Sequence, residues 1–143
     1  MLKTALYGSG LAIALACLPG GEARAQAGLL TGGATDLEPI TLSSGKPLAE
    51  APYELESGKY YRLDITADGT AELAIEGPQF FRNIWIDEVI INDIEVRPLG
   101  LDSIEFDAEG TATISFVTIR PGRFTVRIPG TTGETQQATF NVK

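Results

Sequence analysis

His, Cys and Met, which supply imidazole bases, thiol nucleophiles and soft metal ligands, are almost missing from this chain of 143 residues, which has no His, one Cys and one Met. The Cys is Cys17 and the Met is Met1, so residues 28–143 contain none of the three. A Ser-His-Asp triad needs an imidazole, and thiol nucleophiles and His/Cys zinc sites need groups that this stretch lacks. Those three kinds of chemistry are therefore excluded for residues 28–143.

Carboxylates remain as groups for acid–base chemistry, since the chain has 19 Asp and Glu residues. A glycoside hydrolase needs two of them flanking the scissile bond. Here the acids fall mostly in predicted turns, as Asp68, Asp107 and Glu109 do, or on the polar face of an alternating strand, as Asp64 and Glu72 do. We therefore expect solvated carboxylates and no enzyme activity.

Two groups of acidic residues are candidates for holding a hard cation. They are Asp87-Glu88 with Asn92-Asp93, and Asp102 with Glu105, Asp107 and Glu109. Calcium needs several oxygens that converge from one loop, and neither spacing matches an EF-hand. Alternation along a strand would send Glu105 and Asp107 to one face without closing a cage. Weak binding of copper, iron or calcium through acidic loop oxygens is the alternative function that the sequence leaves open.

The aromatic segment at residues 80–85 supplies the candidate partner-binding residues Phe80, Phe81, Arg82 and Trp85. Phe and Trp beside apolar neighbours commonly fill a core, whereas Trp and Arg are enriched at the energetic centres of protein interfaces. Consecutive residues of an extended strand point to opposite faces. We therefore expect either Phe80 or Phe81 to lie at a surface, an edge or an interface.

Residues 1–27 have the organisation of a secretory signal peptide. Lys3 supplies the positive start, residues 4–18 are apolar and uncharged, and Pro19-Gly20-Gly21 ends any helix. The Ala-x-Ala sites that follow predict cleavage after Ala25 or Ala27.

The predicted destination is the periplasm or the outside of the cell. The apolar stretch is shorter than the roughly 20 residues that span a membrane, so no span is expected after cleavage. Lipid attachment at Cys17 is the less favoured alternative, because a lipobox prefers Leu where Ala14 stands and the Ala-x-Ala sites lie beyond Cys17.

The net charge of −8 at pH 7 bears on the partners. An acidic surface repels nucleic acid and anionic membranes, so neither is expected as a partner. Such a charge commonly serves solubility, and docking of a basic partner is the sharper interpretation. With no Cys beyond residue 17, the hydrophobic core alone must hold the exported fold.

Short alternating segments separated by turn signals predict an all-β domain over residues 38–143, preceded by a flexible lead-in at residues 28–37. About eight strands in two packed sheets fit the pattern, and no helix of useful length is predicted. Asp68-Gly69 predicts a hairpin to the strand at residues 71–75, and Asn92-Asp93 predicts a turn between two further strands.

The segment Gly122-Arg123-Phe124-Thr125-Val126-Arg127-Ile128-Pro129 resembles the pattern Gly-x-Tyr-x-Phe-x-Cys-Pro of the cupredoxin (blue-copper protein) family. The alternating strand and Pro-Gly turn at residues 114–122 are similar to the segment that precedes this pattern in the family. Residues 55–65 are similar to an early strand pair. The resemblance extends from Tyr53 to Val142 and implies a Greek-key β-sandwich of cupredoxin type.

The resemblance also implies where copper ligands would lie. Ile128 stands where the copper Cys would be, residues 130–137 lack the His and Met that follow it in the family, and residues 71–81 lack the first His. A type 1 copper centre needs two imidazoles, a thiolate and usually a weak axial thioether. We therefore expect a cupredoxin-like scaffold with no type 1 copper, no other resident metal and no cofactor. Its expected role is that of a non-enzymatic binding or accessory module for a protein or small ligand.

Overall fold

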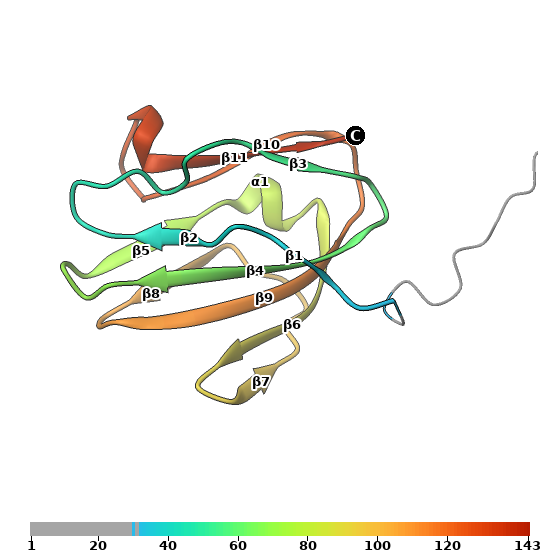
Figure 1. The fold of residues 1–143 in the computed structure, drawn as a ribbon, viewed down its shortest axis with the longest axis horizontal. Helices are drawn as coiled ribbons and strands as arrows, with labels where there is room; N and C mark the ends of the chain where they lie inside the picture. The colour runs from blue at the N-terminus through green and yellow to red at the C-terminus, as the bar shows by residue number, and fades with distance from the viewer. Residues whose placement is uncertain (1–29, 31) are drawn as a thin grey trace, which may run out of the picture.

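The computed structural model describes residue 30 and residues 32–143, which fold into two β-sheets packed face to face (Figure 1). The predicted signal peptide, its cleavage sites and Cys17 lie outside the described residues. The all-β sandwich predicted from the alternating segments is confirmed. None of the helices in the described residues has the length and apolar character needed to cross a membrane.

The first sheet has six strands, with β1, β4, β9, β6 and β7 side by side in that order and β2 also paired to β4. Their bounds are β1 (Thr35–Asp36), β2 (Ile40–Leu42), β4 (Tyr60–Ala67), β6 (Ile84–Ile91), β7 (Ile94–Val96) and β9 (Gly110–Thr118). Both β1 and β2 run parallel to β4. The sheet begins at Thr35, because β1 lies within the stretch predicted to be a flexible lead-in. The folded domain therefore starts ahead of the predicted boundary at residue 38.

The second sheet has five strands in the order β3, β11, β10, β5 and β8. Their bounds are β3 (Tyr53–Leu55), β5 (Leu73–Glu76), β8 (Ser103–Phe106), β10 (Gly122–Arg127) and β11 (Gln137–Val142). One helical turn, α1 (Pro78–Phe81), lies between the two sheets in Figure 1, and a 3-10 turn, η1 (Glu134–Gln136), precedes β11.

The two predicted turns differ in outcome. The hairpin at Asn92-Asp93 is confirmed, with β6 and β7 paired on either side and positive φ angles of 48° and 65° at the two turn residues. The prediction of a hairpin at Asp68-Gly69 is wrong, because β4 lies in the first sheet and β5 in the second, so the two strands do not pair. Both edges of β4 are already occupied, by β9 and by β1 and β2, so the next strand must cross to the other sheet.

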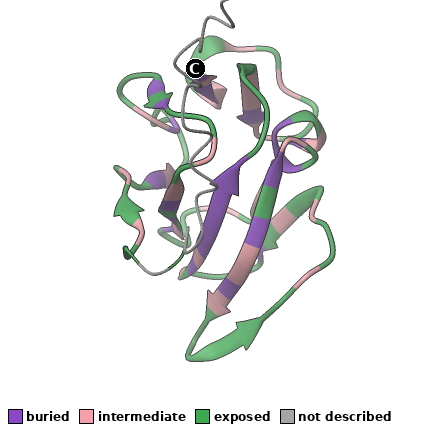
Figure 2. Ribbon diagram, turned by 90° about the vertical axis from the view of Figure 1, so that its right-hand side faces the viewer, coloured by how far each residue is buried: buried purple, intermediate pink, exposed green. Residues whose placement is uncertain are grey.

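The core lies between the inward faces of the two sheets, drawn in purple in Figure 2. The predicted alternation holds in β4, where Tyr61, Leu63 and Ile65 are 3%, 2% and 1% exposed. Phe80 of α1 reaches the centre of the core. Its ring stacks on Phe140 at 4.1 Å between centroids and meets the ring of Phe116 edge-on at 5.5 Å.

A hydrogen-bonded turn holds the crossing from β4 to β5. The carboxylate of Asp68 accepts bonds from the amide of Thr70 at 3.0 Å and from its hydroxyl at 2.6 Å, and the Thr70 hydroxyl accepts from the Ser44 amide at 2.9 Å. Hydrogen bonds from Ser43 and from Thr70 lower the pKa of Asp68 to about 2.

We expect Asp68→Asn to lower the melting temperature by a few degrees at pH 7. The folded-state pKa lies below the ordinary value of 3.8, so the contribution of the carboxylate is fully present above about pH 4 and is lost as the pH falls toward 2. Thermal melts followed by circular dichroism should show the difference between variant and wild type shrinking over that range. A difference that stays constant down to pH 2 would contradict this account.

Candidate functional site

The end of the sandwich where the resemblance places copper ligands is formed by the connection from β10 to β11. Ile128 follows β10 and packs, partly buried, against the core. Its amide donates to the Gln136 carbonyl at 3.0 Å, and the Leu48 amide donates to the Thr135 carbonyl at 2.9 Å. The first bond closes the loop across its own two ends, and the second ties it to the connection between β2 and β3.

Side chains at this end of the sandwich hold the backbone of the loop. The Arg127 guanidinium donates to the Thr131 carbonyl at 2.7 Å and to the side-chain oxygen of Gln137, and the Thr131 hydroxyl donates to the Ile128 carbonyl at 2.6 Å. Hydroxyls, amides and the carboxylate of Glu134 are the side-chain donors available over residues 128–137. They do not match the imidazole and thiolate donors of a type 1 copper centre.

Two of the four predicted partner-binding residues lie in the core. Phe80 is 1% exposed and Phe81 is 4% exposed, so the expectation that one of them would lie at a surface is wrong. The reason is local: Pro78 begins the helical turn α1, and successive residues of a helix do not alternate between opposite faces as those of a strand do.

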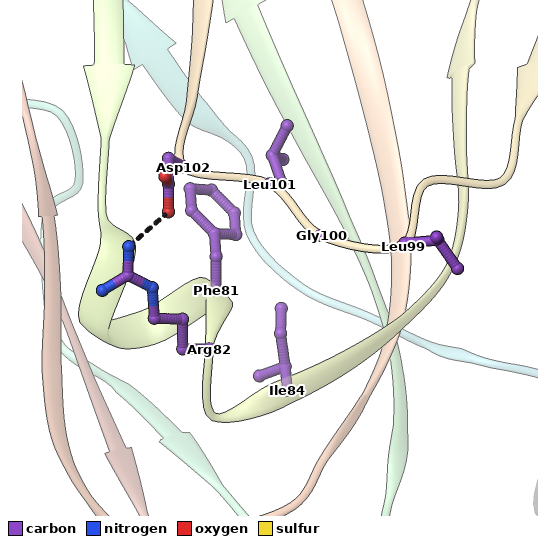
Figure 3. Close-up of a pocket in the computed structure, with 7 residues that line it drawn as sticks. All are labelled: Phe81, Arg82, Ile84, Leu99, Gly100, Leu101 and Asp102. Carbon is purple, nitrogen blue, oxygen red and sulfur yellow. Dashed lines mark hydrogen bonds and ion pairs between the residues drawn. The ribbon is translucent and has the colours of Figure 1, made fainter.

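A shallow groove beside α1 contains one of these aromatic residues and Arg82 (Figure 3). It has a volume of about 350 Å³ and is lined by Phe81, Arg82, Ile84, Leu99, Gly100, Leu101 and Asp102. The Arg82 guanidinium pairs with the Asp102 carboxylate at 3.4 Å, with both side chains 65% exposed. We call this feature the α1 groove.

The structure separates Trp85 from the α1 groove. Trp85 is 49% exposed and does not line the groove, whereas Ile84 does. Neighbours on β6 point to opposite faces, so Trp85 lies on the outer face of the first sheet, paired in register with Val117. The predicted segment therefore serves three places: the core, the groove and the outer face of the sheet.

A β-bulge in β6 brings Asp87 and Glu88 together on that outer face. Asp87 accepts from the Tyr60 hydroxyl and from Arg97, each at 2.9 Å, and Glu88 lies 3.5 Å from Arg97. Burial, followed by the bond to Asp87, raises the pKa of Tyr60. Asp87 and Glu88 thus both pair with Arg97, whereas Asn92 and Asp93, which the sequence grouped with them, form the turn between β6 and β7.

The second predicted acidic group is rearranged. Glu105 and Asp107 gather with Glu72, with carboxylate oxygens within 4.8 Å of one another, whereas Asp102 pairs with Arg82. All three residues of this cluster are exposed. Pairing of β5 with β8 explains why Glu72 joins, which the linear spacing of Glu105 and Asp107 did not indicate.

The feature that the sequence did not indicate is an exposed apolar surface at the β6–β7 hairpin. Ile91, Ile94 and Val96 are 42%, 65% and 46% exposed, and Leu99, which follows them, is fully exposed. Their alternation predicts a strand, but no sequence signal shows that the other sheet leaves that strand uncovered.

No family model matches the chain, and no curated protein matches its sequence. Among solved structures, it is similar to a multi-copper oxidase from Pseudomonas thermotolerans at 15% identity and a TM-score of 0.55, over 79% of this chain and 30% of that one. A multi-copper oxidase from Pseudomonas parafulva gives 17% identity and a TM-score of 0.55, over 76% and 30% of the two chains.

A copper nitrite reductase from Nitrosomonas europaea is also similar, at 17% identity and a TM-score of 0.52, over 66% of this chain and 33% of that one. This chain thus spans about a third of the length of these proteins. The likeness shows the fold alone, and that fold is cupredoxin-like, as the resemblance implied.

We expect Phe80→Ala to lower the free energy of unfolding by about 3–5 kcal/mol, because it removes a ring packed between Phe116 and Phe140. Trp85→Ala, on the outer face, should lower it by about 1 kcal/mol or less. Urea unfolding followed by fluorescence for Phe80→Ala, and by circular dichroism for Trp85→Ala, gives both values. Equal losses would mean that Trp85 is as much a core residue as Phe80.

Proposed function

We propose that this protein is an exported, non-enzymatic binding or accessory module with a cupredoxin-like fold and no type 1 copper site. The observation that carries the proposal is the inventory of donors: residues 28–143 contain no His, Cys or Met. The packing of Ile128 against the core supports it, since a hydrocarbon stands where the resemblance puts the copper Cys. Export rests on the organisation of residues 1–27.

The engagement of the acidic residues supports a role other than catalysis. In the described part of the chain, Asp64 accepts from Thr113 at 2.6 Å, Asp68 is bound by Thr70, and Asp87 and Glu88 are bound by Arg97. Carboxylates held in this way stabilise turns and the outer face of a sheet. They do not form an acid–base pair across the α1 groove, whose single carboxylate is that of Asp102.

We place the binding of a partner at the α1 groove. Phe81 and Ile84 line the groove but are themselves buried, so its accessible apolar side chain is the fully exposed Leu99, which can be covered only by another molecule or by a rearranged loop. The ion pair of Arg82 with Asp102 is solvent-exposed and therefore weak, so a carboxylate of the partner can compete for Arg82. The partner that fits is a protein that presents an apolar side chain beside a single carboxylate, on a surface that is otherwise basic, since the net charge of −8 on this chain favours a basic partner.

A second candidate function is weak handling of copper, iron or calcium through carboxylate oxygens. The approach of Glu72, Glu105 and Asp107 to within 4.8 Å of one another favours it. Exposed acidic groups without a bound ion are common, so we rank this candidate below the binding module.

Copper titration tests the first proposal. Protein is taken from the periplasmic fraction of expressing cells, where a first residue of Gln26 or Gly28 would agree with the predicted cleavage. We expect no intense blue absorption on adding Cu(II) and no stoichiometric copper after dialysis, because the ligands are missing. A blue, tightly held copper ion would overturn the proposal. Weak binding seen by calorimetry and lost in Glu105→Gln would favour the second candidate.

Site-specific photocross-linking tests the binding surface. With a benzophenone side chain at position 99, we expect a discrete product with another protein in cells, lost in Arg82→Ala and kept in Trp85→Ala. The matched control carries the same group at position 119, where Ile119 is also an exposed apolar residue at 53%. The same product from both positions, or no product from position 99, would rule out the α1 groove as the binding surface.

A further inference from the structure

Strand β7 is the sheet edge that leaves its apolar residues uncovered. The described sheets end at β1 with β2, at β7, at β3 and at β8. On β2, β3 and β8 the apolar side chains are buried or partly buried, whereas Ile94 and Val96 of β7 are 65% and 46% exposed. Figure 2 shows exposed residues, in green, along the lower rim of the molecule, where β7 lies in Figure 1.

We infer that β7 pairs with β7 of a second copy of this chain, antiparallel across a two-fold axis, so that the first sheet continues from one copy into the other. An open strand edge presents unpaired amide and carbonyl groups, which makes it a template for another strand. This inference is independent of the proposed function, since either can fail without the other.

The hairpin decides which backbone groups are free. In a two-residue hairpin the residues that flank the turn form a hydrogen-bonded pair. Here these are Ile91 and Ile94, and the pairing then continues with Val89 and Val96. The amide and carbonyl groups of Ile94 and Val96 therefore face β6. Those of Glu95 face the open edge, and in the proposed pairing Arg97, the residue that follows β7, extends the strand so that its groups face the same edge.

Side-chain charge then selects the register. With Val96 on the two-fold axis, Glu95 of each copy lies opposite Arg97 of the other in a hydrogen-bonded pair, and the two Val96 side chains meet. A register with Glu95 on the axis would oppose two carboxylates, and one with Arg97 on it would oppose two guanidinium groups, which destabilises a cross-strand pair. Only the first register gives both favourable charge pairs and an apolar centre.

Arg97 retains the capacity for this contact. It already binds Asp87, Glu88 and Glu95 of its own chain, yet its side chain is 61% exposed, and a guanidinium carries five N–H donors. Asp87 and Glu88 lie one strand further from the edge and are also bonded to Tyr60 and Ser115. Glu95 is therefore the carboxylate closest to the second copy.

The expected dimer is closed and weak. A two-fold contact uses the same strand in both copies, so it does not propagate into a fibre. A pair of three-residue strands buries far less than the roughly 1,200 Å² of a stable interface. The net charge of −8 on each chain also opposes association. We therefore expect a dimer that forms only at high micromolar concentration or above, in salt of about 0.15 M that screens charges beyond about 8 Å.

Sedimentation velocity over a range of concentrations tests the surface. We expect the sedimentation coefficient of the wild type to rise with concentration toward that of a dimer, and Val96→Lys to stay monomeric. Ile119→Lys, which changes another exposed apolar residue, is the matched control and should behave as the wild type does. A wild type that is monomeric at millimolar concentration, or a Val96→Lys variant that still associates, would overturn the inference.

A mixing experiment tests the register independently. Glu95→Arg alone opposes positive charges and Arg97→Glu alone opposes negative ones, so each should be monomeric, whereas an equimolar mixture restores both opposite-charge pairs and should associate. Arg123→Glu, an equal charge change on β10 of the other sheet, is the control and should leave wild-type association intact. Failure of the mixture to associate while the wild type does so would overturn the Val96-centred pairing.

Discussion

The contact of Phe80 with Phe140 and Phe116 is the interaction that joins the parts of this fold. Phe80 belongs to α1, Phe140 to β11 of the second sheet and Phe116 to β9 of the first, so one ring contacts both layers from the helical turn between them. Gly77 allows that approach, because a Cβ there would lie 2.5 Å from Val126 Cγ1. The same helical turn borders the α1 groove and leads within a few residues into β6.

The scaffold and the chemistry are separable in this chain. Solved copper oxidases and a copper nitrite reductase share its fold. That fold depends on inward-facing apolar side chains, and many different residues of similar shape can fill those positions. Copper binding instead depends on a few donor atoms, and Ile128, at the position that the resemblance assigns to the copper Cys, packs against the core. This chain shares its fold with these copper proteins at less than 20% sequence identity. That likeness is therefore compatible with a function that depends on the surface of the protein alone.

The sequence predicted the strands better than their partners. Alternation located β4 and β9, and Asn92-Asp93 located the β6–β7 hairpin, because both signals are local. The Asp68-Gly69 turn misled, because whether the next strand pairs or crosses depends on distant strands that occupy both edges of β4. The burial of both Phe80 and Phe81 was missed because one turn of helix is too short to produce a periodic pattern. Likewise, the cluster of Glu72 with Glu105 needs cross-strand pairing that spacing does not reveal.

The bulge in β6 explains why one strand serves both the core and a charged surface. Ile84 and Ile86 point inward, so strict alternation would bury Glu88 and expose Val89. The register instead pairs Ile86 with Phe116 and Glu88 with Ser115, which leaves Asp87 as the extra residue. Beyond it the parity is reversed, so Val89 enters the core at 5% exposure and Glu88 turns outward. The same shift aligns Ile91, and through the hairpin Ile94 and Val96, with the inward face at a place beyond the cover of the second sheet. The extra residue Asp87 thus has two consequences: it keeps the Glu88 carboxylate out of the core, and it leaves the apolar side chains of β7 exposed at the edge of the sheet.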